Sequence, residues 1–182
     1  MNRRLLIILG MVFAALVVIT ILQSRPQPIQ IANNDLFTSF LGRDLNMTVL
    51  DIQAIRLRDP QTDQSFVISR DTSGNWTAPN NEGSLDTVTA SNIAKTVVVM
   101  PYQQSVAVTD ETNLEQYGFR PNGVLSIEVV LTDGSGHVIA AGGLSPDGYQ
   151  YYVLVDEQPS LYLMERGAVD YLLAQLVQPP LT

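Results

Sequence analysis

Hydrophobic and polar residues alternate along much of the chain after residue 46. In the stretch 124–133, VLSIEVVLTD, the apolar side chains of Leu125, Ile127, Val129 and Leu131 alternate with mostly polar neighbours. An alternation of period two places successive side chains on opposite faces of a β-strand. Comparable patterns predict strands at 47–59, 65–71, 75–79, 102–110, 124–133, 137–144, 149–156 and 161–165.

Short turn clusters separate these strands, namely DPQTDQ, TSG, DGSG, SPDG and EQPS. Glycine, proline, aspartate and serine favour turns, and tight turns join neighbouring antiparallel strands. We therefore expect an antiparallel sheet in which the last four strands follow one another directly.

Three segments have helical spacing. The stretch 84–100 has a candidate N-cap at Ser84 or Asp86, and Pro101 ends it. Its TVVVM run is β-branched and suits a strand equally well, so the end of this helix stays open. The stretch 167–177 is amphipathic, and 35–46 suits a short helix or turn near a membrane. The apolar stripes contain Val88, Ile93, Val97 and Met100 in the first helix and Val169, Leu172, Leu173, Leu176 and Val177 in the second.

This order of elements predicts an α+β fold: an antiparallel sheet, or two small ones, with helices packed on it. The most hydrophobic stretch, residues 5–22, precedes that domain and carries no charge. As a helix it would span about 27 Å, close to the roughly 30 Å hydrocarbon core of a bilayer. We predict a single transmembrane helix, with anchor residues Leu5, Leu6, Ile7, Ile8, Leu9, Val12, Phe13, Leu16, Val17, Val18, Ile19, Ile21 and Leu22.

The charges around the apolar stretch predict its orientation. Arg3 and Arg4 precede it, and only Arg25 follows it closely. The positive-inside rule then places the N-terminus in the cytoplasm and the rest of the chain outside it. A cleaved signal peptide is the alternative, although no A-x-A-like site follows. The predicted divisions are an anchor at 1–25, a juxtamembrane spacer at 26–46, an extracytoplasmic domain at 47–178 and a tail at 179–182.

Composition excludes several classes of function. The chain has 10 basic and 18 acidic residues, a net charge of −8 and no cysteine. An acidic chain is a poor match for nucleic acid, so we expect no nucleic-acid partner. Without cysteine there is no thiolate catalysis, iron–sulfur cluster, attached c-type haem or cysteine-based zinc site.

The sequence contains no catalytic motif. His137 is the only histidine and follows the DGSG turn, and we interpret it as a surface or edge residue. There is no G-x-S-x-G elbow and no second histidine for a metal pair. The DGSGH and SPDGYQ turns hold too few carboxylates for a calcium loop. We therefore predict a protein that is not an enzyme and has no catalytic, metal-binding or cofactor-binding residue.

The aromatic residues provide one candidate interaction surface. Tyr149, Tyr151, Tyr152 and Tyr162 lie on two neighbouring predicted strands. By alternation Tyr149 and Tyr151 share one face and Tyr152 lies on the other. A tyrosine-rich sheet can bind a glycan or a protein, and ordinary cross-strand packing is the alternative. Trp76, after a turn, is expected to anchor the core.

The segment 113–123, NLEQYGFRPNG, predicts a corner in the chain. A helical turn capped at Thr109 or Asp110 would end at Gly118, where glycine supplies a positive φ. The aromatic residues on either side would hold the corner against the core. We interpret it as a structural joint made by Tyr117, Gly118, Phe119 and Pro121.

The order of several motifs resembles a bacterial domain of unknown function, family 4340. These motifs are GNW at 74–76, YGFRP at 117–121, a DG-turned hairpin, AAGGL, GYQYYV at 148–153 and LYLM at 161–164. Phe119 stands where leucine is usual, and the chain holds one copy where many relatives carry tandem copies. The resemblance implies a membrane-anchored extracytoplasmic component, often associated with gliding-type ABC transporters, and it brings no catalytic residue.

We therefore expect a non-enzymatic accessory or scaffold subunit at the bacterial inner membrane, with most of the chain in the periplasm. Its partners would be the lipid bilayer and the subunits of a membrane-embedded complex, either an ABC transporter or a respiratory or photosynthetic electron-transfer complex. The alternative is an envelope glycan- or peptide-binding module that uses the tyrosine-rich face. A hydrolase with an unrecognised site is a third hypothesis.

Overall fold

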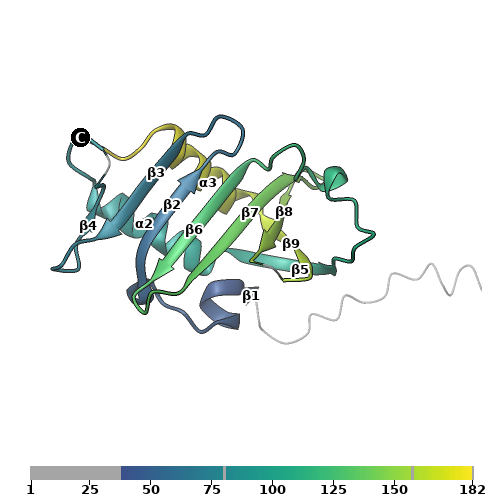
Figure 1. The fold of residues 1–182 in the computed structure, drawn as a ribbon, viewed down its shortest axis with the longest axis horizontal. Coiled ribbons are helices and arrows are strands. Elements are labelled where there is room, and N and C mark those ends of the chain that lie inside the picture. Colours follow the sequence, from purple (N-terminus) through teal and green to yellow (C-terminus); the bar gives the residue numbers. More distant parts are fainter. Residues whose placement is uncertain (1–37, 80, 157, 182) are drawn as a thin grey trace, which may run out of the picture. The chain divides into compact units, whose positions relative to one another are not determined.

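The structure is a computed structural model that describes residues 38–79, 81–156 and 158–181. These residues form one nine-stranded sheet (Figure 1) in the order β1-β5-β9-β8-β7-β6-β2-β3-β4. The strands are β1 (Thr38–Ser39), β2 (Ile52–Arg58), β3 (Ser65–Arg70), β4 (Trp76–Thr77), β5 (Pro101–Ala107), β6 (Leu125–Leu131), β7 (Gly136–Leu144), β8 (Gln150–Val155) and β9 (Ser160–Glu165). Helices α2 (Thr87–Val99) and α3 (Arg166–Val177) and three short helical turns complete the described fold.

Every pair of neighbouring strands is antiparallel. Strands β6 to β9 follow one another as hairpins, as the turn clusters predict. The first meander joins them through β2, which pairs with β6 and places Arg56 opposite Glu128. These two side chains form an exposed ion pair at 3.2 Å. The alternation therefore predicts strands β2 to β9, and of the two expected arrangements, one sheet or two small ones, the structure has one sheet.

Both α-helices pack on the same face of the sheet (Figure 1). On β6, Leu125, Ile127 and Val129 are buried toward the helices, whereas Glu128 and Val130 point the other way. The core beneath the helices joins these strand residues to Ala90, Ile93, Ala94 and Val97 of α2 and Val169, Leu172 and Leu176 of α3. We call the opposite side of the sheet the helix-free face. It includes Arg56, Val106, Glu128, Val130, Val138, Tyr152 and Leu154.

Helix α2 begins at one of its two predicted caps, but one predicted member of the apolar stripe of each helix is exposed. Asp86 caps α2, and this helix continues through the β-branched run to Val99. Val88 is 67% exposed and Val177 is 70% exposed, so the prediction that these two residues belong to the apolar stripes is wrong. The reason is that the buried stripe of α2 runs through Ala90, which the apolar pattern does not mark.

The predicted fold class is wrong. The described residues form a mostly antiparallel β fold with two α-helices, and not an α+β fold led by a membrane helix. Within residues 38–181, apart from the positions left out above, no helix is both long and apolar enough to cross a membrane. The apolar stretch 5–22, with all of the predicted anchor residues, lies outside the described residues. The physical reason for the correction is that period-two alternation fills most of the chain after residue 46, which leaves few residues for helices.

The described part of the segment 35–46 includes a short helical turn, as the sequence predicts, and also a strand. It contains β1 and a π-helical turn at Phe40–Asp44. Phe40 is 4% exposed and Leu41 is 1% exposed, and both belong to the hydrophobic core. The second half of the predicted juxtamembrane spacer is therefore part of the domain.

The predicted corner forms around Gly118. A short 3-10 turn, Leu114–Tyr117, is capped by Asn113 and not by Thr109 or Asp110. Gly118 follows it with φ of +78°, as predicted. A Cβ atom added at Gly118 would lie 2.4 Å from the backbone nitrogen of Gly143. The corner therefore packs directly against β7, and glycine is required there for both its φ and its size.

Candidate functional site

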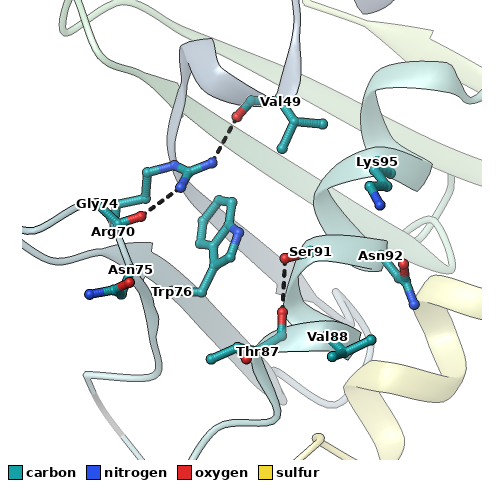
Figure 2. Close-up of a pocket in the computed structure, with 10 residues that line it drawn as sticks. All are labelled: Val49, Arg70, Gly74, Asn75, Trp76, Thr87, Val88, Ser91, Asn92 and Lys95. Atoms are coloured by element: carbon teal, nitrogen blue, oxygen red, sulfur yellow. Dashed lines mark hydrogen bonds between the residues drawn. The ribbon is translucent and has the colours of Figure 1, made fainter.

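A groove lies between the β3–β4 turn and helix α2. Its volume is about 540 Å³, within the roughly 300–1,000 Å³ that is common for ligand sites. Figure 2 shows the side chains that line it. We call it the Arg70–Trp76 groove, and its lining residues are Val49, Arg70, Gly74, Asn75, Trp76, Thr87, Val88, Ser91, Asn92 and Lys95.

The turn at residues 71–75 positions Trp76. Asp71 Oδ1 accepts the backbone N–H of Ser73 at 2.8 Å and that of Asn75 at 2.9 Å. The hydrogen bond from Asn75, more than any other, holds the pKa of Asp71 below its usual 3.8. Gly74 has φ of +82°, a conformation that glycine adopts readily. The turn is thus fixed by its own polar groups, and β4 starts directly after it.

Arg70 lies opposite Trp76 in the β3–β4 ladder, with its guanidinium carbon 4.3 Å from the centre of the indole ring. Its Nε donates to the carbonyl of Ile52 at 3.0 Å, Nη1 to that of Gly74 at 2.7 Å and Nη2 to that of Val49 at 3.1 Å. Arginine has five N–H donors, so these three bonds leave some donors available. The cation–π contact and the three carbonyls hold the guanidinium in one orientation.

Helix α2 forms the other wall of the groove. The Asp86 carboxylate caps its N-terminus by accepting the backbone N–H of Val88 at 3.0 Å. Thr87, Ser91 and Lys95 recur at every fourth position, which places them along one side of the helix. The hydroxyl of Ser91 donates to the carbonyl of Thr87 at 2.8 Å, as Figure 2 shows. The apolar side of α2 is in the core, so the polar side is free to line the groove.

Several donors of this groove have no partner among the described residues. They include the indole N–H of Trp76, the amide of Asn92 and the ammonium group of Lys95. None of the described residues that line the groove is acidic, although the chain has a net charge of −8. Arginine and lysine carry positive charges at neutral pH. The groove therefore suits a ligand with a negative charge and several hydrogen-bond acceptors.

A second cavity, of about 480 Å³, contains His137, and we call it the His137 pocket. Nδ1 of His137 lies 2.7 Å from Oδ2 of Asp156. The other oxygen of Asp156 accepts the backbone N–H of Val138 at 2.7 Å. The ring of Phe40 packs edge-on against the imidazole, with 6.5 Å between ring centres. The histidine is thus held between a carboxylate and the core, in place of the simple surface position expected from the sequence.

The carboxylates around the His137 pocket bond to their own turns. Asp51 accepts the N–H of Thr48 at 2.7 Å and its hydroxyl at 2.8 Å. Asp133 accepts the N–H of Ser135 at 2.9 Å and its hydroxyl at 2.6 Å. The N–H of Thr48 lowers the pKa of Asp51, and the hydroxyl of Ser135 lowers that of Asp133. These acceptors therefore stabilise local structure.

The four tyrosines singled out from the sequence do not share one surface. The hydroxyl of Tyr151 donates to Asp170 at 2.9 Å, and Tyr162 is also buried. Burial comes first among the causes that raise the pKa of both phenols. Tyr152 packs against Tyr117 with ring centres 4.9 Å apart, on the helix-free face. Tyr149 is 75% exposed, in the turn before β8.

Reasoning from the sequence missed the Arg70–Trp76 groove. It predicted that Trp76 anchors the core, and this is confirmed, since Trp76 is 7% exposed and belongs to the core cluster. Two signals in the sequence could have indicated the groove. One is Arg70 placed six residues before Trp76 across a tight turn. The other is the four-residue spacing of Thr87, Ser91 and Lys95 on the predicted helix.

No family model, no curated protein and no solved structure matches the chain. The resemblance to family 4340 therefore stays a prediction. In any fold, function resides in the site, so the chemistry of the Arg70–Trp76 groove indicates what the domain can bind.

Proposed function

We propose that the domain is a non-enzymatic binding module of an accessory subunit, and that its Arg70–Trp76 groove binds an acidic saccharide. One observation carries this proposal. The groove presents donors of Trp76, Asn92 and Lys95 that have no partner among the described residues, and none of its described lining residues is acidic.

The positive charges favour a carboxylate ligand. The guanidinium of Arg70 is already fixed on the ring of Trp76, so its remaining donors meet an anion with little loss of rotamer freedom. Lys95 adds a second charge on a flexible side chain. Among the described residues that line the groove, these two cations are the titratable side chains. Such a composition suits binding better than proton transfer at neutral pH.

The uncharged donors favour a ligand rich in hydroxyl groups. The indole N–H of Trp76, the amide of Asn92 and the hydroxyl groups of Thr87 and Ser91 border the same space. A few polar groups around an aromatic ring orient a ligand by hydrogen bonds while the ring packs against its carbon atoms. A uronic acid combines hydroxyl groups with one carboxylate and so matches both parts of the groove.

The accessory role and the location rest on the sequence. The apolar stretch 5–22 and the arginines before it support a place at the bacterial inner membrane, with the domain on the outer side. Acidic saccharides of the cell envelope are accessible on that side. A membrane-embedded complex that carries this subunit would thereby gain a binding site for the envelope.

A fluorescence titration of the full chain tests this function. Trp76 is the only tryptophan, so its emission reports on the groove alone. We expect oligogalacturonate to change the emission until it saturates, and neutral oligogalactan to leave it unchanged. Lys95→Gln should weaken binding about tenfold, because a charge-assisted hydrogen bond contributes roughly 1.5 kcal/mol.

Asp133→Asn is the matched control, since it removes one charge at the other cavity and should leave binding unchanged. An equal response to the neutral and the acidic oligosaccharide would refute the proposal. So would binding that is insensitive to Lys95→Gln. If inorganic phosphate competes as well as oligogalacturonate, the groove is an anion site and the saccharide assignment fails.

A further inference from the structure

Strand β5 provides an open edge of the sheet that the proposed saccharide site does not use. Strand β5 ends the sheet except where the two-residue β1 pairs with Pro101 and Tyr102 (Figure 1). From Gln103 to Ala107, no described residue pairs with the outer side of β5, and all five of these residues are exposed. We call residues 103–107 the β5 edge.

The backbone of the β5 edge presents hydrogen-bonding groups outward. The N–H of Val108 donates to the carbonyl of Pro159 at 2.8 Å, so Val108 faces inward, toward the chain that leads into β9. Hydrogen-bonding direction alternates along an antiparallel strand. The N–H and C=O groups of Ser105 and Ala107 therefore point away from the sheet. Among the described residues they have no backbone partner.

Proteins usually block such an edge with charged side chains, proline or a bulge. Here Pro101 and the irregularity between Tyr102 and Gln104 lie at the start of β5, beside β1. The residues after them, QSVA at 104–107, contain no charge and no proline. The second half of the strand is thus free of these protective features.

We propose that the β5 edge binds an extended peptide segment of a partner protein by β-strand addition, with basic residues at the end of the segment that lies beside Ala107. Main-chain hydrogen bonds to Ser105 and Ala107 would supply affinity in this mode of recognition. Asp110 and Glu111 lie three and four residues after Ala107 and are exposed, and they attract the basic end.

The geometry also sets the direction of the bound segment and the character of its central residues. All neighbouring strands of the sheet are antiparallel, and antiparallel addition places the N-terminal end of the segment beside Ala107. Val106 is 49% exposed on the helix-free face. It can therefore contact an apolar side chain of the bound segment, in which apolar residues would alternate with polar ones. A second copy of this chain fits less well, because its own β5 has no basic residue and each copy carries a net charge of −8.

NMR of the isotope-labelled full chain in detergent micelles tests the proposal with two synthetic heptapeptides, KKTVTVT and EETVTVT. We expect the basic peptide to shift the backbone amides of Gln103 to Ala107 and to bind roughly five-fold more tightly than the acidic one, as for two exposed ion pairs. Shifts confined to other residues, no shift at all, or equal affinity for both peptides would overturn the proposal.

Ser105→Pro removes an outward N–H, and proline is tolerated on an edge strand where the N–H faces solvent. This variant should lose the peptide, whereas Ser105→Ala should bind it like the wild type. Unchanged far-UV circular dichroism of both variants keeps the comparison valid. Two results without peptide would overturn the proposal. Protection of the β5-edge amides from hydrogen exchange would show that the chain itself fills the edge. Amide shifts that depend on protein concentration would show that a second copy fills it.

Discussion

The Arg70–Trp76 groove and the His137 pocket share one short turn, Val49–Asp51, yet they use their polar groups in opposite ways. Val49 lines the groove, and Asp51 lines the pocket. In the pocket, Asp51 and Asp133 accept hydrogen bonds from their own turns. In the groove, the donors of Trp76, Asn92 and Lys95 find no acceptor within the described residues.

This difference separates structural polar groups from groups available to a ligand. A hydrogen bond within the chain contributes to folding, and removal of one partner leaves the other unsatisfied. A donor without a partner in the fold contributes nothing of that kind, so its loss should leave the fold intact and affect only a ligand. The two cavities therefore predict opposite responses of stability and binding to substitution.

Trp76→Ala should have the largest effect, because it acts on both the fold and the groove. Removing a buried tryptophan side chain costs about 3 kcal/mol or more of unfolding free energy, measurable by chemical denaturation. Trp76→Phe keeps most of the packing but deletes the indole N–H. It should weaken oligogalacturonate binding in calorimetry, and full affinity of this variant would show that the indole N–H is not a ligand donor.

Asp156→Ala should affect the fold alone. It leaves the N–H of Val138 and the Nδ1 atom of His137 without their acceptor, which should lower the free energy of unfolding by about 2 kcal/mol. Asp110→Ala, at an exposed loop position, is the control and should change it by under about 0.5 kcal/mol. Saccharide binding should be unchanged in both variants. Loss of binding in Asp156→Ala would move the ligand site to the His137 pocket.

Gly74→Ala and Gly134→Ala form a matched pair. Both glycines have positive φ, +82° and +87°, and a Cβ atom at either would meet nothing within 4 Å. Each substitution should therefore cost about 1 kcal/mol of stability. Gly74 also lines the groove and its carbonyl holds Arg70 at 2.7 Å, so Gly74→Ala alone should weaken oligogalacturonate binding. Equal binding by the two variants would indicate that the position of Arg70 does not matter.

The smallest expected effect is a pH dependence at Asp51. Its pKa is lowered in the fold by the N–H of Thr48 and then by the hydroxyl of the same residue. The stability that this carboxylate contributes is present above the unfolded pKa near 3.8 and is lost as pH falls through the lower folded value. Asp51→Asn should thus be less stable than wild type at pH 7, and the two should converge once the pH falls below the lowered pKa of Asp51. A difference in unfolding free energy between the two proteins that stays constant as the pH falls would contradict this role of Asp51.

The sequence predicts the strands well because strand alternation is a local property. The stretch 124–133 and its DG turn contain their own pattern, and β6 and β7 form there. Gly118 was likewise recognisable as a corner, since only glycine readily takes a positive φ. The predicted fold class is wrong because strand alternation fills most of the described residues, which contain two α-helices, while the apolar stretch 5–22 lies outside them.

Arrangements between distant residues could not be predicted in this way. The pairing of β2 with β6 brings Arg56 beside Glu128, 72 residues apart, and no local pattern encodes it. The groove likewise depends on contacts between residues that are distant in the sequence. It needs the register that places Arg70 opposite Trp76, and it needs the rotation of α2 that turns Val88 to solvent and Lys95 toward the groove.

The most direct test of the central claim is the side-chain indole resonance of Trp76 in a proton–nitrogen NMR spectrum. The chain has one tryptophan, so this spectrum contains one such signal. If the groove donors are available to a ligand, oligogalacturonate shifts the signal and neutral oligogalactan does not, in wild type and in Asp156→Ala alike. An indole signal that stays in place while resonances around His137 move would contradict the account.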